Sequence, residues 1–255
     1  MNTKDYLLRI GVEAEDLEPT EEVLRLLQRK HLQHVPFENL DIHWKRPIVL
    51  DTGKFYEKIV KKKRGGFCYE LNGLFNDLLR DIGFSTRIVS ARVADDKGDF
   101  GPEFDHMAII VAIDDDEFLA DVGFGAFTAE SLRFVLDEQQ QDDTGSYIIK
   151  QLGDGYFQVA RKDGDEWKSE YIFRDIPHEL SEFAEMCDFQ QYSPESHFTK
   201  GKVCSLLTGN GRKTLTDKKF IVTAHGEKTE TAVESEKEFE RILEREFVIR
   251  PLSPH

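Results

Sequence analysis

Long apolar runs and basic charge are both scarce in this chain of 255 residues. The longest apolar run, at 107–113, is far too short to cross a bilayer, and the N-terminus lacks the apolar core of a signal peptide. The formal net charge of -15 argues against nucleic acid or an anionic membrane surface as the main partner. These absences predict a soluble, cytoplasmic protein in which an anionic ligand needs a local basic site.

Cysteine is scarce as well, since the chain has only three, Cys68, Cys187 and Cys204. An odd number without a CxxC pair indicates neither a disulfide framework nor a zinc site. The histidines show no metal-ligand spacing, so we predict no metal. We interpret Cys187 and Cys204 as structural residues.

The hydrophobic fraction of 39% is enough for a substantial core, and the residue patterns divide the chain into three parts. The first part, to residue 83, is mainly helical, although Pro36 and Pro47 predict an extended, hairpin-like excursion between the helices. From Phe84, strand-like segments with Gly and Asp at their connections predict an antiparallel sheet or small barrel. After Pro177 the pattern is mixed and ends in an amphipathic helix.

The stretch RGGFCYELNGLF at 64–75 predicts a reactive thiol. Apolar residues after Cys68 recur at helical spacing, so Cys68 lies in the first turn of a helix, whose free N–H groups and positive end favour a thiolate. Gly65 and Gly66 allow a sharp turn and the close approach of a ligand. The alternative is a buried, inert cysteine. The basic run at 61–64 either steers an anion or is a solvated edge.

A cysteine nucleophile needs a base, and the base needs an orienting group. His106 opens the apolar strand predicted at 106–113, and Asp121 lies in the strand predicted to follow it. The acidic turn at 114–116 joins these strands, so hairpin pairing brings the two side chains close. The alternatives are a satisfied core histidine and a structural salt bridge. We predict a triad of His106 and Asp121 with Cys68.

Four motifs in order resemble the arylamine N-acetyltransferase family, and the resemblance covers the chain from residue 20 to about 220. They are VPFENL at 35–40, RGGFCYELNGLF at 64–75, DHMAIIV at 105–111 and ADVGFG at 120–125. The resemblance implies an α+β fold with a cysteine-protease-like core and the active site between its domains. These domains would be a helical N-terminal domain at 1–83, a central antiparallel β-barrel at 84–190 and a C-terminal α/β lid at 191–255.

The family resemblance also implies the reaction and the role of each triad residue. Cys68 would take the acetyl group from acetyl-coenzyme A, with His106 as its base and Asp121 as the orienting group. The acetyl group would then pass to an arylamine, hydrazine or N-hydroxyarylamine, by a ping-pong mechanism that serves xenobiotic metabolism and uses no metal. The partners would be small molecules, and the sequence predicts no oligomeric state.

Further site residues follow from the same resemblance. The positions that would line an apolar pocket for the aromatic amine are Phe37, Val93 and Phe124, and each fits a core position equally well. Backbone N–H groups of Cys68, Gly123 and Gly125 are the expected oxyanion donors. Four basic residues either neutralise the phosphates of coenzyme A or are solvated surface residues: Lys200, Lys202, Arg212 and Lys213.

Two other classes of protein stay open on the residues alone. The chain order Cys, His, Asp would also serve a hydrolase or a transglutaminase-like enzyme, which would turn over a peptide or glutamine substrate without acetylation of Cys68. A non-catalytic protein that keeps the fold and binds a small molecule is the second alternative. The presence of all three triad residues argues against it.

Overall fold

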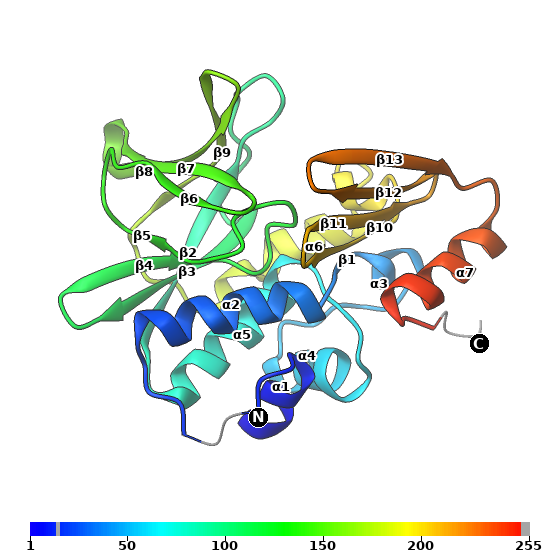
Figure 1. The fold of residues 1–255 in the computed structure, drawn as a ribbon, viewed down its shortest axis with the longest axis horizontal. Coiled ribbons are helices and arrows are strands. Elements are labelled where there is room, and N and C mark those ends of the chain that lie inside the picture. Colours follow the sequence, from blue (N-terminus) through cyan, green and yellow to red (C-terminus); the bar gives the residue numbers. More distant parts are fainter. Residues whose placement is uncertain (14–15, 251–255) are drawn as a thin grey trace.

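The computed structural model describes residues 1–13 and 16–250, arranged in three groups of elements. In Figure 1 the helices of the first third lie below, a large strongly twisted sheet lies at the upper left and a smaller sheet lies at the right. This arrangement confirms the predicted α+β fold with a helical first part, a barrel-like sheet and a mixed third part.

The first third is helical, as predicted. Its elements are α1 (Thr3–Arg9), α2 (Glu21–His34), α3 (Leu40–His43), α4 (Thr52–Tyr56), the π-helix η1 (Glu57–Lys61) and α5 (Cys68–Ile82). Helix α2 begins after Thr20, whose hydroxyl accepts a hydrogen bond from the backbone N–H of Val23 at 3.3 Å. Helix α5 ends at Gly83, whose φ of 110° is readily adopted only by glycine. Within the described residues no helix is long and apolar enough to cross a membrane.

The central sheet has eight antiparallel strands in the order β5-β4-β3-β2-β9-β8-β7-β6. They are β2 (Ser85–Val93), β3 (His106–Ile113), β4 (Asp116–Ala120), β5 (Leu132–Arg133), β6 (Gln140–Asp142), β7 (Gly145–Gln151), β8 (Tyr156–Asp163) and β9 (Glu166–Arg174). The predicted hairpin of β3 and β4 is present, with Ile109 paired to Ala120 and Ile113 to Asp116. The turn between them therefore sets His106 and Asp121 at the same end of the hairpin.

The third part joins a few short helices to a second antiparallel sheet of order β1-β10-β11-β12-β13. Its elements are η3 (Leu180–Phe183), α6 (Ala184–Tyr192), η4 (His197–Thr199), β10 (Val203–Thr208), β11 (Gly211–Thr216), β12 (Lys219–Ala224), β13 (Glu227–Ala232) and α7 (Glu236–Phe247). Phe239, Leu243 and Phe247 of α7 are buried against this sheet with Leu215. The predicted final helix is thus confirmed, while the predicted pattern showed only one of its strands, near β12.

The segment 35–51 differs from the expected hairpin-like excursion. Within it, β1 (Phe37–Glu38) is the strand, and it pairs antiparallel with β10, where Phe37 lies opposite Ser205. The chain then turns directly into α3. The segment contains no second strand to form a hairpin with β1. The partner of β1 comes from a distant part of the chain, and local sequence patterns do not reveal such pairings.

One apolar cluster places α5 beneath the central sheet. Leu71, Leu74 and Phe75 of α5 are fully buried in it, together with Ile109 of β3 and Ala120 of β4. Side chains of α1 and α2 complete the same cluster. Because α5 begins at Cys68, this packing fixes the start of the helix near His106 at the start of β3. The sequence placed Asp121 in a strand, but it is the first residue of the loop after β4, because β4 ends at Ala120.

Gly65 is needed for the close packing of two backbone segments. A Cβ atom at Gly65 would lie 1.9 Å from the carbonyl oxygen of Pro36, and Gly66 forms a parallel bridge with Phe37. The close approach expected at these glycines is therefore made by the chain itself, in the segment that leads into β1.

We expect Gly65→Ala to lower the free energy of unfolding by about 3 kcal/mol, because its methyl group would force two backbone segments apart. Denaturant unfolding followed by circular dichroism measures this change. Gly209→Ala is the matched control, because no described atom beyond its two neighbours in the chain lies within 4 Å of a Cβ at Gly209. Equal stability of the two variants would contradict the assigned role of Gly65.

Candidate active site

Cys68 is the first residue of α5 and only 3% of its surface is exposed. Burial raises the pKa of its thiol well above the ordinary value, and the charge of Asp105 acts in the same direction. The backbone N–H of Tyr69 opposes this rise. The helix start predicted for Cys68 is confirmed, but its N–H groups alone do not produce the thiolate. A proton acceptor is needed.

His106, the residue expected in this role, is the first residue of β3. Its Nε2 atom lies 2.7 Å from Oδ2 of Asp121, and both side chains are almost completely buried. With the proton on Nε2, the imidazole donates to the carboxylate and keeps Nδ1 free to accept another proton. The predicted proximity of these two residues is therefore confirmed, at hydrogen-bonding distance.

The carboxylate of Asp121 is held by further donors. Asn72, one turn after Cys68 on α5, donates from Nδ2 to Oδ1 of Asp121 at 2.9 Å and to the carbonyl of Met107 at 2.5 Å. The Asn72 side-chain oxygen accepts from the backbone N–H of Val122 at 2.8 Å. One side chain of α5 therefore ties the Asp121 carboxylate to the strand that begins at His106. From α2, Gln28 also accepts the Asp121 backbone N–H at 3.2 Å.

The loop after β4 lies directly against the backbone of Cys68. A Cβ atom at Gly123 would lie 2.8 Å from Cα of Cys68, so only glycine fits there. The backbone N–H of Gly123 donates to Oδ1 of Asp121 at 2.9 Å. The N–H of Gly123, which was expected to bind the oxyanion, is therefore already bonded to Asp121. The N–H groups of Cys68 and Gly125 have no such assigned partner among the described residues.

The three expected pocket residues lie at different places around the site. The ring of Phe124 meets the ring of His106 edge-on at 5.1 Å between centroids, and it also meets Tyr171 at 5.1 Å. Phe37 lies 6.1 Å from the ring of Phe198. Val93 ends β2 and pairs with Tyr171 of β9. All three expected residues are half-buried. Phe124 contacts the ring of His106, and Phe37 packs against the apolar cluster that includes Cys68.

A buried ion network surrounds the segment before Cys68. Arg64 contacts Asp41 and Glu38 at 2.6 Å each, and Lys58 contacts Asp41 and Glu70 at 2.8 Å each. Burial acts to raise the pKa of Asp41, but Lys58 and Arg64 lower it on balance. Glu70 also accepts the backbone N–H of Phe67, which caps α5. Part of the basic run expected at 61–64 is therefore structural.

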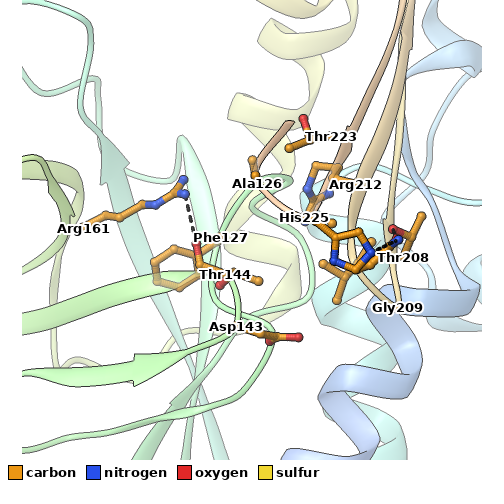
Figure 2. A pocket seen from close by; sticks show the side chains of 14 residues that line it. Ala126, Phe127, Asp143, Thr144, Arg161, Thr208, Gly209, Arg212, Thr223 and His225 are labelled. Carbon is orange, nitrogen blue, oxygen red and sulfur yellow. Dashed lines mark hydrogen bonds between the residues drawn. The ribbon is translucent and has the colours of Figure 1, made fainter. Parts of the chain in front are cut away.

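A cavity of about 670 Å³ opens between the central sheet and the second sheet (Figure 2). Arg161 of β8 and Arg212 of β11 line it, and neither pairs with a carboxylate among the described residues. Burial lowers the pKa of Arg212 to about 10, and the nearby charge of Arg161 adds to this effect. Phe127 also lines the cavity, and its ring lies 5.5 Å from that of Phe124. Phe127 therefore lies between the cavity and Phe124, and Phe124 in turn contacts His106.

The other basic residues expected near phosphates are occupied elsewhere. Lys202 pairs with Asp217 and Glu236, and Lys213 lies 3.8 Å from a carboxylate oxygen of Glu246. Lys200 donates to a backbone carbonyl at 3.0 Å. Of the four residues named from the sequence, Arg212 alone lines the large cavity. The part of the chain that the structure describes contains no group of three or more potential metal ligands.

Comparison with known proteins places the chain in a family. A family model described as N-acetyltransferase matches residues 20–252. The chain therefore belongs to the arylamine N-acetyltransferase family, which confirms the resemblance of its four motifs.

Individual relatives agree with this assignment. The arylamine N-acetyltransferase / N-hydroxyarylamine O-acetyltransferase of Salmonella typhimurium is 36% identical over 79% of this chain and 72% of its own length. A solved structure of the Salmonella arylamine N-acetyltransferase superposes with a TM-score of 0.91 at 31% identity, covering 96% of this chain and 90% of that one.

Two further solved structures bear on the site. A Bacillus cereus arylamine N-acetyltransferase described with a Cys-His-Glu triad has a TM-score of 0.90 at 26% identity, covering 98% of this chain and all of that one. A Mycobacterium marinum arylamine N-acetyltransferase in complex with CoA has a TM-score of 0.89 at 27% identity, covering 97% and 93%. Acetyl-CoA as co-substrate fits this family.

Sequence analysis missed Asn72 and Arg161. Asn72 lies four positions after Cys68, so helical spacing alone could have placed it on the same face of the helix as Cys68. No comparable signal marked Arg161, because its partner in the cavity, Arg212, is far away in the chain and in another sheet.

We expect Asn72→Ala to slow modification of Cys68 by acetyl-CoA about a hundredfold, because Asp121 and His106 lose their fixed position relative to α5. Stopped-flow or quench kinetics of acetylation measures this effect. Asn76→Ala is the control, since Asn76 is equally buried on α5 but bonds to Thr86 instead. A similar loss of rate in both variants would indicate general damage to α5.

Proposed function

We propose that Cys68, His106 and Asp121 form the catalytic triad of an acetyl-CoA:arylamine N-acetyltransferase. The observation that carries this proposal is the 2.7 Å contact between His106 and Asp121, tied by Asn72 to the helix that starts at Cys68. Asp121 would be the third member of this triad, whereas the triad of the Bacillus cereus relative is described with Glu as its third member.

In the first half-reaction His106 accepts the thiol proton on Nδ1, and Asp121 stabilises the resulting imidazolium. The sulfur of Cys68 forms a bond to the carbonyl carbon of acetyl-CoA, and the bond from that carbon to the sulfur of coenzyme A breaks. The leaving thiolate takes the proton from His106. Because burial raises the pKa of Cys68, the thiolate forms only together with the imidazolium.

In the second half-reaction the nitrogen of an arylamine or hydrazine attacks acetyl-Cys68. A carbon–nitrogen bond forms, His106 accepts the amine proton, and the carbon–sulfur bond breaks to release Cys68, which regains a proton. An N-hydroxyarylamine would accept the acetyl group in the same way. We assign stabilisation of the oxyanion to the backbone N–H groups of Cys68 and Gly125.

For the acceptor we propose a pocket bounded by Phe37, Val93 and Phe124. The edge-on contact of Phe124 with His106 supports its place next to the reacting carbon. We also propose that the chain divides into three domains after residues 83 and 190, and that the active site lies between them. A cytoplasmic location, a role in xenobiotic metabolism and the absence of metal and nucleic acid stay predictions.

Mass spectrometry of the intact protein tests the first half-reaction directly. After mixing with acetyl-CoA and no amine, we expect one acetyl group on Cys68, which disappears when an arylamine is added. Cys68→Ser should lose amine acetylation about a thousandfold or more, because a serine hydroxyl is far harder to ionise. No acetylation, together with turnover of a peptide or glutamine substrate, would support the hydrolase or transglutaminase-like alternative.

We further propose that the phosphates of coenzyme A bind in the cavity at Arg161 and Arg212. Two half-buried arginines without a carboxylate partner among the described residues form a local cationic site in an acidic protein. The carboxylate of Asp143, which also lines the cavity, is occupied by Arg29 at 2.8 Å.

We expect Arg161→Gln and Arg212→Gln each to raise the KM for acetyl-CoA about tenfold, with a much smaller change in the KM for the amine. Steady-state kinetics with one substrate varied at a time measures both constants. Lys202→Gln is the control, because Lys202 is ion-paired outside this cavity. A rise in the KM for acetyl-CoA in the control variant alone would place the phosphates elsewhere.

A further inference from the structure

Asp105 is a second carboxylate beside the Cys68 and His106 pair. It directly precedes His106, at the end of the connection from β2 to β3. The hydroxyl of Tyr69, the residue after Cys68, donates to the carbonyl of Phe104 at 2.6 Å and approaches that of Asp105 at 3.4 Å. The backbone that carries Asp105 is therefore fixed against the first turn of α5.

The side chain of Asp105 is held as well. Its Oδ1 atom accepts a hydrogen bond from Nε2 of Gln190 on α6 at 2.7 Å. The other end of the Gln190 amide accepts from the hydroxyl of the buried Ser196 at 2.6 Å. One turn before Gln190, Cys187 is buried in the same apolar cluster as Cys68. These contacts keep the carboxylate where α6 meets the start of α5.

The charge of Asp105 is not neutralised by a strong cation. Among the described residues it forms no ion pair with lysine or arginine, and the titratable groups that lower its pKa by their charge are His106 and His197. Burial raises the pKa of this carboxyl, although part of its surface meets solvent. Of the charged groups that raise the pKa of Cys68, Asp105 has a larger effect than Asp121. Since Tyr69, the residue after Cys68, is hydrogen-bonded to the backbone at 104–105, this carboxylate lies beside the first turn of α5, where its charge acts on a reagent that approaches Cys68.

We propose that Asp105 is a specificity-determining residue that disfavours acyl acceptors with a negative charge close to the reacting amine. A carboxylated arylamine would be repelled as it approaches acetyl-Cys68, whereas a neutral or cationic amine or hydrazine would not. The acceptor part of this inference rests on the proposed acetyl transfer through Cys68. The charge effect at the sulfur does not, because any anionic reagent must experience it.

The first test therefore uses alkylation, which needs no acetyl transfer. Iodoacetate and iodoacetamide react with a thiol in the same way and differ by one negative charge. In Asp105→Asn we expect the ratio of their rates at Cys68, iodoacetate over iodoacetamide, to rise about tenfold at low ionic strength, and less at high ionic strength. Any change in the pKa of the thiol cancels in this ratio. Peptide mapping confirms that Cys68 is the labelled residue.

Asp99→Asn is the matched control, because Asp99 is an exposed carboxylate of the same β2–β3 connection. Its ratio should equal that of the unchanged protein. Asparagine at 105 still accepts the hydrogen bond from Gln190, and Asp105→Thr provides a second neutral variant if the first is unstable. An unchanged ratio in folded neutral variants would overturn the proposal, as would the same shift in Asp99→Asn.

The second test measures the acceptor preference itself. The kcat/KM for para-aminobenzoate relative to para-toluidine should rise about tenfold in Asp105→Asn and stay constant in Asp99→Asn. A shifted alkylation ratio with no acetyl transfer in the unchanged protein would overturn the proposed function and the acceptor preference together. A shifted alkylation ratio with an unchanged acceptor preference would overturn the specificity role alone.

Discussion

The carboxylate of Asp121 accepts hydrogen bonds from three parts of the molecule, and the site depends on this meeting point. His106 donates from the start of β3, Asn72 from α5 and the backbone of Gly123 from the loop after β4. A buried carboxylate needs such donors, since each missing one would leave charge without compensation. The same bonds fix the relative position of helix, strand and loop, so stability and the geometry of the site share one set of contacts.

The second support is the buried ion network in front of the nucleophile helix. Arg64 and Lys58 are surrounded by three carboxylates, Glu38, Asp41 and Glu70. Such a cluster often contributes no more to stability than apolar residues of the same volume, but removing one member leaves an uncompensated buried charge. Through Glu70, which caps α5 at Phe67, this arrangement defines where the helix starts. The ion network therefore fixes α5 through Glu70, and Asn72 fixes it through Asp121.

Much of this site could be predicted from the sequence, because Cys68 and His106 each begin a regular element and Asp121 directly follows one. Helical spacing placed Cys68 at a helix start, and the short hairpin placed Asp121 near His106. What could not be predicted depends on contacts between distant segments. The expected hairpin near Pro36 became an edge strand of another sheet, and the two arginines of the cavity come from different sheets. Local patterns carry no information about such pairings.

The pairing of β1 with β10 has a consequence for the order in which the protein is made. Asn39, just after β1, accepts the backbone N–H of Val203 from a position 164 residues earlier in the chain. While a ribosome is still adding the central sheet, the VPFEN segment has left the exit tunnel but lacks its partner strand. Until β10 has been made, the backbone of β1 has only its bridge to Gly66, and its other edge stays unpaired. Strands β10–β13, made after the central sheet, complete a sheet whose first strand was made near the start.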